Sequence, residues 1–260
     1  MLELKEAFGR YMGRYYVSLT PTTRAMKSFA ERGISKSIVW APDRMIDQVQ
    51  DMLAAWRKND NDGGPGSSAH LPVMIVATGK DYSPVLGDFS RQVPEPEWVT
   101  LPGDPHNRIF QLRQMQGERR AQIVICAAED ETARSMAAQF TLFIAAVVNR
   151  RFDATYRFAG INHLWPVMLE ATDVPAMNID SGQKNLTILA IDLTLKETIP
   201  LFLGPKAGEQ NDGKGDGSAD NPHGYPAVGQ VISHDLVQNV HSHVVDGAPD
   251  VLWHQGVPEL

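Results

Sequence analysis

The stretch Arg108–Arg151 constrains the fold more than any other part of the chain. Its sequence predicts a strand, a tight turn at Gln116-Gly117-Glu118, a second strand and one long amphipathic helix over Asp130–Arg150. Gly117 can supply a positive φ at the turn, and Asp130 is a candidate cap of the helix. None of these elements contains a recognisable nucleophile, phosphate-loop or metal-ligand motif, which favours a structural role over an enzymatic one.

The remaining chain contains further periodic segments and several loops. The apolar patterns predict helices, strands and one irregular hairpin, namely the helix Leu2–Tyr16, the hairpin Met26–Trp40 ending in the strand Ser37–Ala41, the helix Asp43–Arg57, and the strands Leu71–Thr78 and Asn185–Glu197. The composition of Asn59–Ala69 and Ser83–Pro105, rich in glycine or proline, predicts loops.

The composition excludes several classes of protein. The chain has 260 residues, a net charge of −7 and one cysteine, so an internal disulfide cannot form. No apolar run reaches the roughly 18 residues that span a bilayer, and the N-terminal residues do not match a secretory signal, so we expect a cytosolic setting without a membrane partner. Cys126 lies in an apolar run and is expected to be a buried strand thiol.

The C-terminal third changes in composition at about residue 206. Residues 206–223 are polar and rich in glycine, which predicts a flexible linker between a domain at 1–205 and the last segment. Residues 224–260 contain scattered apolar residues but are too few to bury a core alone. We therefore expect an extended C-terminal arm that lies on its own body or on a neighbouring subunit.

Three patterns suggest chemistry, and each is incomplete. Five of the eight histidines lie in the tail, at His223, His234, His241, His243 and His254. His241 and His243 would share one face of a strand, but no third metal ligand stands at a recognisable spacing. Asp212–Gly217 departs from a calcium loop, and Gly79-Lys80 lacks the upstream glycine and the hydroxyl residue of a phosphate loop. We predict no catalytic, cofactor or metal site.

Arginines cluster around the central stretch. They precede or flank the predicted hairpin and follow the predicted helix, at Arg108, Arg113, Arg119, Arg120, Arg150, Arg151 and Arg157. Two interpretations stay open: solvated strand ends and a helix terminus, or a basic patch that meets an acidic partner surface.

The order of these parts resembles the tail terminator, or neck, protein family of contractile-tailed bacteriophages. The resemblance covers roughly residues 1–205 and rests on the order of the elements and on short sequence patches. These patches are Tyr11-Met12-Gly13-Arg14-Tyr15-Tyr16, Ile38-Val39-Trp40-Ala41-Pro42 before Met45–Trp56, Leu71-Pro72-Val73-Met74-Ile75, Tyr82-Ser83-Pro84, Arg119–Ala127 with Glu129-Asp130, and Leu186–Leu195 ending at Pro200-Leu201-Phe202. A glycine- and aspartate-rich C-terminal extension also fits the family, whereas Ser83–Pro105 and the histidine-rich tail depart from it.

The resemblance implies both a fold and a role. The fold would be α+β, with a mainly antiparallel sheet packed by two or three helices and an extended C-terminal arm. The role would be a hexameric ring in the virion, assembled in the host cytoplasm, that ends the tail tube and sheath and joins the head-to-tail connector or collar. Double-stranded DNA would pass through its channel without specific binding, which an acidic chain favours.

Two alternatives remain at this point. The chain could form another ring of the neck or the baseplate. From a different class, it could be a small metal-dependent hydrolase that uses the C-terminal histidines. The family has no active site to carry over, so the resemblance implies no enzyme, no cofactor and no site residues.

Overall fold

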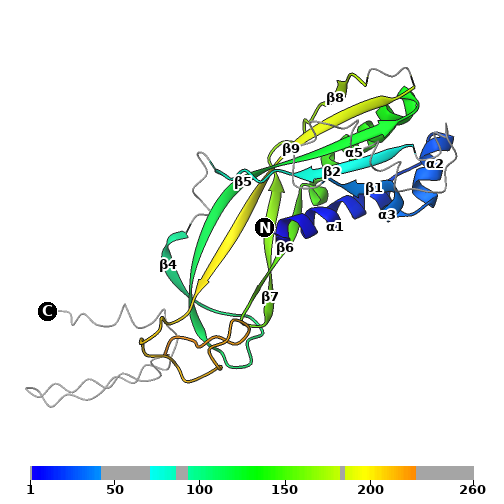
Figure 1. The fold of residues 1–260 in the computed structure, drawn as a ribbon. Coiled ribbons are helices and arrows are strands. Elements are labelled where there is room, and N and C mark those ends of the chain that lie inside the picture. Colours follow the sequence, from blue (N-terminus) through cyan, green and yellow to red (C-terminus); the bar gives the residue numbers. More distant parts are fainter. Residues whose placement is uncertain (1, 42–70, 86–92, 182–184, 227–260) are drawn as a thin grey trace, which may run out of the picture. The chain divides into compact units, whose positions relative to one another are not determined.

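The computed structural model describes residues 2–41, 71–85, 93–181 and 185–226. Within these ranges the chain forms an α+β fold, in which helices accompany a nine-stranded, mainly antiparallel sheet (Figure 1). This confirms the predicted fold class. The predicted helix 43–57, the loop 59–69 and the arm beyond residue 226 lie outside the described residues.

The described elements follow one another along the chain as helices, then strands, then one long helix and a second set of strands. They are α1 (Leu2–Ser18), α2 (Arg24–Glu31), α3 (Ile34–Ser37), β1 (Ile38–Trp40), β2 (Val73–Thr78), β3 (Ser83–Pro84), β4 (Val93–Thr100), β5 (Ile109–Ala127), α5 (Asp130–Ala145), the 3₁₀ turn η1 (Val147–Asn149), β6 (Arg151–Phe158), β7 (Ile161–Leu169), β8 (Ala176–Ile179) and β9 (Thr187–Leu203).

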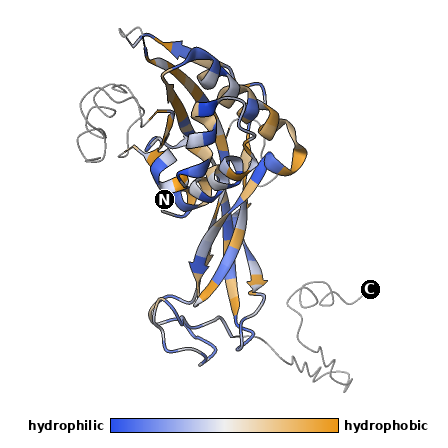
Figure 2. Ribbon diagram, turned by 90° about the vertical axis from the view of Figure 1, so that its right-hand side faces the viewer, coloured by the Kyte–Doolittle hydropathy of each residue, from blue (hydrophilic) through white to orange (hydrophobic). Residues whose placement is uncertain are grey.

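The sheet is organised around two long strands, β5 and β9. The strand order is β1-β2-β5-β9-β7-β6, and β3 and β4 also pair with β5 while β8 pairs with β9. β1 runs parallel to β2, and β2 runs antiparallel to β5, with Val73 opposite Cys126 and Thr78 opposite Ala121. Both hydrophobic and hydrophilic residues occur along the strands of the sheet (Figure 2). In β5, burial alternates over residues 109–112, as in a strand with one buried face, whereas residues 121–127 are all buried.

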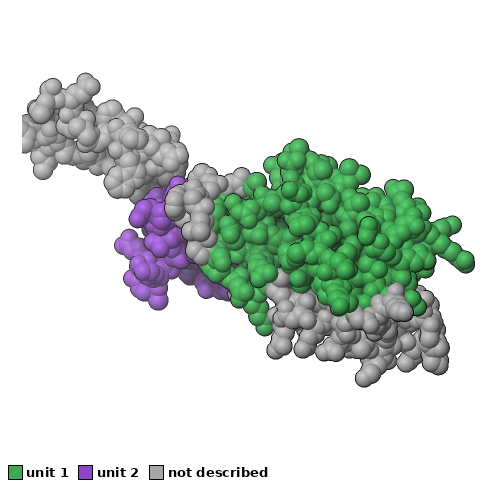
Figure 3. All heavy atoms as spheres, turned by 90° about the horizontal axis from the view of Figure 1, so that it is seen from above, with its two compact units in different colours: residues 1–91, 116–155, 164–199 green, residues 92–115, 156–163, 200–260 purple. Residues whose placement is uncertain are grey.

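The chain forms two compact units (Figure 3). Unit 1 contains residues 1–91, 116–155 and 164–199, and unit 2 contains residues 92–115, 156–163 and 200–260. These units divide the chain differently from the predicted boundaries at residues 205 and 223, because β5 and β9 each contribute residues to both units.

An aromatic cluster from three elements forms part of the core of unit 1. Its members are Phe8, Tyr11 and Tyr15 of α1, Phe140 and Phe143 of α5, and Phe152 of β6, and each is buried. The rings of Tyr11 and Phe152 lie 4.8 Å apart, and those of Tyr15 and Phe140 lie 5.1 Å apart edge to face. Such pairs stabilise the fold beyond their buried area. The aromatic spacing of α1 therefore fixes this helix against α5 and β6.

The two buried tyrosines of this cluster also form hydrogen bonds. The Tyr15 hydroxyl donates to the Met136 carbonyl at 2.6 Å, and the Tyr11 hydroxyl donates to the Asn149 carbonyl at 2.8 Å. Burial raises the pKa of both phenols well above its usual value, so both remain protonated donors. A second cluster in unit 1 joins β2, β5 and β9 through side chains that include Ile75, Val124 and Ile188.

Unit 2 combines a small apolar cluster with a buried ion pair. Phe110 packs with Leu101 and Ala159. Arg108 is 2% exposed, and its guanidinium donates to both carboxylate oxygens of Asp104, at 3.0 and 2.9 Å. The remaining Arg108 nitrogen donates to Asn221 Oδ1 and to the Pro222 carbonyl, each at 2.7 Å. Residues 206–226, although their composition is that of a flexible linker, are thus tied to this unit by hydrogen bonds.

The predicted hairpin at residues 108–127 is wrong. Ile109–Ala127 is one continuous strand, β5, and the glycines with positive φ in the described chain do not include Gly117. β4 and β2 pair antiparallel with different halves of β5, so no chain reversal is needed at its middle. A Cβ at Gly117 would collide with the ring of Tyr82, which explains the glycine without a turn.

Three further predictions need correction. Ser83–Pro105 is not entirely a loop, because Val93–Thr100 forms β4. Residues 24–31 form the helix α2 in place of a hairpin arm, and the Thr23 side chain caps it by accepting from the Met26 amide at 3.2 Å. The long helix ends at Ala145, and its N-cap is Glu129 rather than Asp130, without a side-chain capping bond. Asp130 pairs instead with Arg134, at 2.8 Å.

Candidate interaction surface

A groove in unit 1 brings together exposed cationic and aliphatic side chains. It has a volume of about 820 Å³ and lies along α1, η1, β6 and β7. Arg10 and Arg14 of α1 and Arg151 of β6 line it together with Val148 and Leu164. All five of these residues are exposed. The groove therefore offers both charge and apolar area to a partner.

Helix α1 places two arginines on the groove because of their spacing. Arg10 and Arg14 stand four residues apart, so they share one face of the helix, while the aromatic face packs into the core. Arg10 Nη2 donates to the Asp153 carbonyl and to Thr155 Oγ1, each at 3.4 Å. Arg14 Nη2 donates to the Arg151 carbonyl at 3.2 Å. These bonds direct both guanidiniums over the backbone of β6.

The groove carries positive charge although the chain as a whole is acidic. Among the described residues, none of the guanidiniums of Arg10, Arg14 and Arg151 forms an ion pair with a carboxylate. Asp153 is the one acidic residue among the described lining residues. A guanidinium has five N–H donors, so Arg10 and Arg14 retain donors for carboxylates of a partner.

Aliphatic side chains extend from the groove onto the neighbouring turn. Val148 is 69% exposed and Leu164 is 66% exposed. Leu142 of α5 and Val147 of η1, which precede Val148 in the chain, are also largely exposed. Single exposed aliphatic residues are common on protein surfaces, but apolar residues together with arginines are typical of protein–protein interfaces.

The seven arginines for which two interpretations stayed open are only partly exposed. Arg108 and Arg119 are buried in ion pairs with Asp104 and Glu197, and Arg157 pairs with Asp220 at 3.1 Å. Those three arginines are therefore neutralised within the fold. Arg113, Arg120, Arg150 and Arg151 are exposed. No sequence pattern connects Arg151 with Arg10 and Arg14, although the four-residue spacing of the two α1 arginines indicates that they share one face of the helix.

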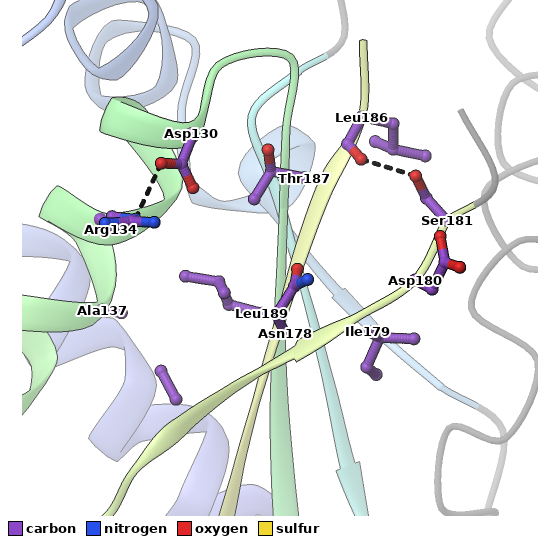
Figure 4. A pocket seen from close by; sticks show the side chains of 11 residues that line it. Asp130, Arg134, Ala137, Asn178, Ile179, Asp180, Ser181, Leu186, Thr187 and Leu189 are labelled. Carbon is purple, nitrogen blue, oxygen red and sulfur yellow. Dashed lines mark hydrogen bonds and ion pairs between the residues drawn. The ribbon is translucent and has the colours of Figure 1, made fainter. Parts of the chain in front are cut away.

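A second pocket in unit 1 is more polar and has a volume of about 650 Å³ (Figure 4). Asp130 and Arg134 of α5 lie on one side of it, and Asn178, Asp180 and Ser181 lie on another. The Ser181 hydroxyl donates to the Leu186 carbonyl at 2.7 Å. Neither a histidine nor a lysine is among its described lining residues.

The other sequence patterns do not combine into a reactive site in the described part of the chain. Cys126 is a fully buried thiol within β5, as predicted. The Gly79 amide donates to the Arg120 carbonyl at 2.7 Å and so is not free to bind a phosphate. The described residues contain no group of three or more potential metal ligands. Of the five tail histidines, His223 is described, and its Nδ1 lies 2.9 Å from the Lys214 carbonyl.

None of the described helices combines the length and the apolar character needed to cross a lipid bilayer. No protein-family model matches the chain, and no curated protein matches it in sequence. The properties of the groove along α1 therefore follow from the residues that line it.

Proposed function

We propose that this chain is a structural virion protein that forms a ring, hexameric by its resemblance, at the head-proximal end of a contractile phage tail. The ring terminates the tail tube and sheath and joins them to the head-to-tail connector or collar. Double-stranded DNA passes through its channel without specific binding. The protein assembles in the host cytoplasm and remains in the neck of the virion.

The observation that carries this proposal is the exposed groove along α1. A ring subunit must contact a neighbour on each side, and such a contact needs apolar area together with polar groups. Val148 and Leu164 supply the apolar area, and the arginines of α1 and β6 supply the polar groups. The element order and the short patches from Tyr11–Tyr16 to Pro200–Phe202 support the same role.

The location of the protein in the particle tests this proposal. Antibodies against the chain, or cryo-EM of purified virions, should place six copies between the tail tube and the head connector. Antibody binding at the baseplate would favour a different tail ring. Complete absence of the chain from assembled virions would refute the structural role.

The interaction with DNA provides a separate test. The net charge of −7 gives the chain little capacity to hold phosphates. Filter binding with double-stranded DNA at near-physiological salt should therefore show no tight complex. A sub-micromolar Kd would contradict a channel through which DNA passes passively.

A further inference from the structure

The C-terminal segment 227–260 has the chemistry that complements the groove along α1. It contains no lysine or arginine, and its four acidic residues are Asp235, Asp246, Asp250 and Glu259. Between them lie many aliphatic residues and Trp253. The groove presents positive charge, through Arg10, Arg14 and Arg151, next to the exposed side chains of Val148 and Leu164.

We propose that residues 227–260 of a second copy of this chain bind in the groove formed by α1, η1, β6 and β7. Carboxylates of the segment pair with the guanidiniums of Arg10, Arg14 and Arg151. Its aliphatic side chains cover Val148 and Leu164. Each copy thereby gives a segment to one neighbour and receives a segment from another, which links identical subunits through one repeated contact.

The length of the segment permits this exchange. It has 34 residues, and an extended chain of that length spans up to about 110 Å. It begins directly after Tyr225 and Pro226, and the Tyr225 amide donates to the Ile109 carbonyl at 2.8 Å, which anchors its start to the folded chain. A segment of this length that starts at a fixed point and contains apolar residues at intervals can reach a neighbouring copy and cover apolar area on it.

Side chains, rather than strand pairing at β6, supply this contact. β6 is the last strand in the order of the sheet, but its carbonyls at Arg151 and Asp153 already accept hydrogen bonds from Arg14 and Arg10. The partner therefore meets guanidinium donors at these two positions of the strand. This favours a segment with spaced carboxylates, as residues 227–260 have.

Photo-cross-linking in the full-length chain tests the proposal. Benzoyl-phenylalanine replaces Leu164 in the groove or, as a control, Val17, which is exposed on α1 but does not line the groove. Unlabelled and ¹⁵N-labelled copies are mixed before irradiation, and cross-linked peptides are identified by mass spectrometry. The Leu164 position should capture peptides from residues 227–260 of the other isotope, whereas the Val17 position should not.

Charge variants test the pairing itself. Arg10→Glu with Arg14→Glu should lower the yield of the cross-link at least tenfold, while the matched pair Arg113→Glu with Arg120→Glu should not. Because the α1 arginines also contact β6, a second variant leaves the groove intact and changes the four acids of the segment to their amides. It should produce the same loss.

Three outcomes would overturn the proposal. They are cross-links that join residue 164 to other parts of the chain, cross-links confined to a single copy, and yields that the amide variant does not change. The inference shares with the proposed function only the self-association of the chain. Its test uses purified protein, so its failure would leave the location of the protein in the virion open.

Discussion

The ring of Tyr82 occupies the space in which a Cβ of Gly117 would lie. The Tyr82 hydroxyl donates to the Gln116 carbonyl at 3.0 Å, and β3 pairs its residue Pro84 with Gly117. A glycine in the middle of a long strand is normally unfavourable. Here it lets an aromatic ring lie directly on the backbone of β5, which covers peptide groups that a glycine leaves open.

Substitution of Gly117 should therefore be costly only while the ring is present. Gly117→Ala should lower the free energy of unfolding by about 1–3 kcal/mol, the usual range for overpacking. In a Tyr82→Ala background the same substitution should cost clearly less. Urea unfolding of the four variants gives the coupling energy, and additive effects of the two substitutions would contradict the contact.

A second prediction concerns the buried ion pair between β5 and β9. Arg119 Nε donates to Glu197 Oε1 at 2.6 Å, and the two side chains are 7% and 3% exposed. Removal of one partner leaves a buried charge, so Glu197→Met should cost about 3–5 kcal/mol of stability. Arg119→Met combined with Glu197→Met should recover much of this loss, because neither charge then remains.

The exposed pair Asp130–Arg134 is the matched control. Its side chains are 56% and 75% exposed at a similar distance of 2.8 Å. Asp130→Met should change the free energy of unfolding by about 1 kcal/mol or less, since water screens such pairs. Equal losses for Glu197→Met and Asp130→Met would show that burial does not control the strength of the β5–β9 pair.

The stability of unit 2 should depend on pH through Asp104. Burial raises the pKa of this carboxyl, but hydrogen bonds from Arg108 and His106 and the charge of Arg108 outweigh burial and lower it to about 2. A carboxyl with a lowered folded pKa stabilises the fold above its unfolded pKa of about 4. The contribution, about 2 kcal/mol, should be lost as the pH falls from about 4 to 2.

Asp104→Asn should flatten this part of the pH dependence. The amide keeps the shape of the carboxyl but does not titrate near pH 3, so stability between pH 2 and 5 should vary less than in the unsubstituted chain. Unfolding measured by tryptophan fluorescence at each pH provides the comparison. An unchanged slope in the variant would mean that other carboxyls control the acid transition.

The sequence predicted those elements whose periodicity is strong. The aromatic spacing of α1 and the apolar face of α5 predicted two helices, and the structure shows that these helices meet in the core. Turn signals were less reliable. Gly117 suggested a turn that does not exist, whereas the real turn between β6 and β7 uses Ala159 and Gly160, with φ of 52° and 76°. Alanine rarely adopts a positive φ, so tertiary packing determines the position of this turn and the local sequence does not predict it.

The sequence does not predict the candidate surface, for a related reason. Arg108 and Arg119 look like surface residues in the sequence, but Asp104 and Glu197 neutralise them in the interior. Glu197 stands 78 residues from Arg119 along the chain, so only the fold reveals the pairing. Arg10 and Arg151 are similarly remote in sequence, and they line one groove only because α1 packs on β6.

The last prediction compares two truncations of the C-terminus. A chain ending at Pro226 keeps Asn221 and Pro222, which accept hydrogen bonds from buried Arg108. A chain ending at Lys206 loses both acceptors, and also the Tyr225 amide that donates to Ile109. Each buried donor left without a partner costs about 1–3 kcal/mol. The shorter chain should therefore have a destabilised unit 2.

Hydrogen exchange at the amides of β4 and of residues 109–115 distinguishes the two chains. These amides should exchange much faster in the chain ending at Lys206, and about as slowly as in the full-length protein in the chain ending at Pro226. Amides of α5 in unit 1 serve as the internal reference. Equal protection of unit 2 in both truncations would mean that residues 207–226 contribute little to its stability. Loss of protection in the longer chain as well would mean that unit 2 depends on residues 227–260.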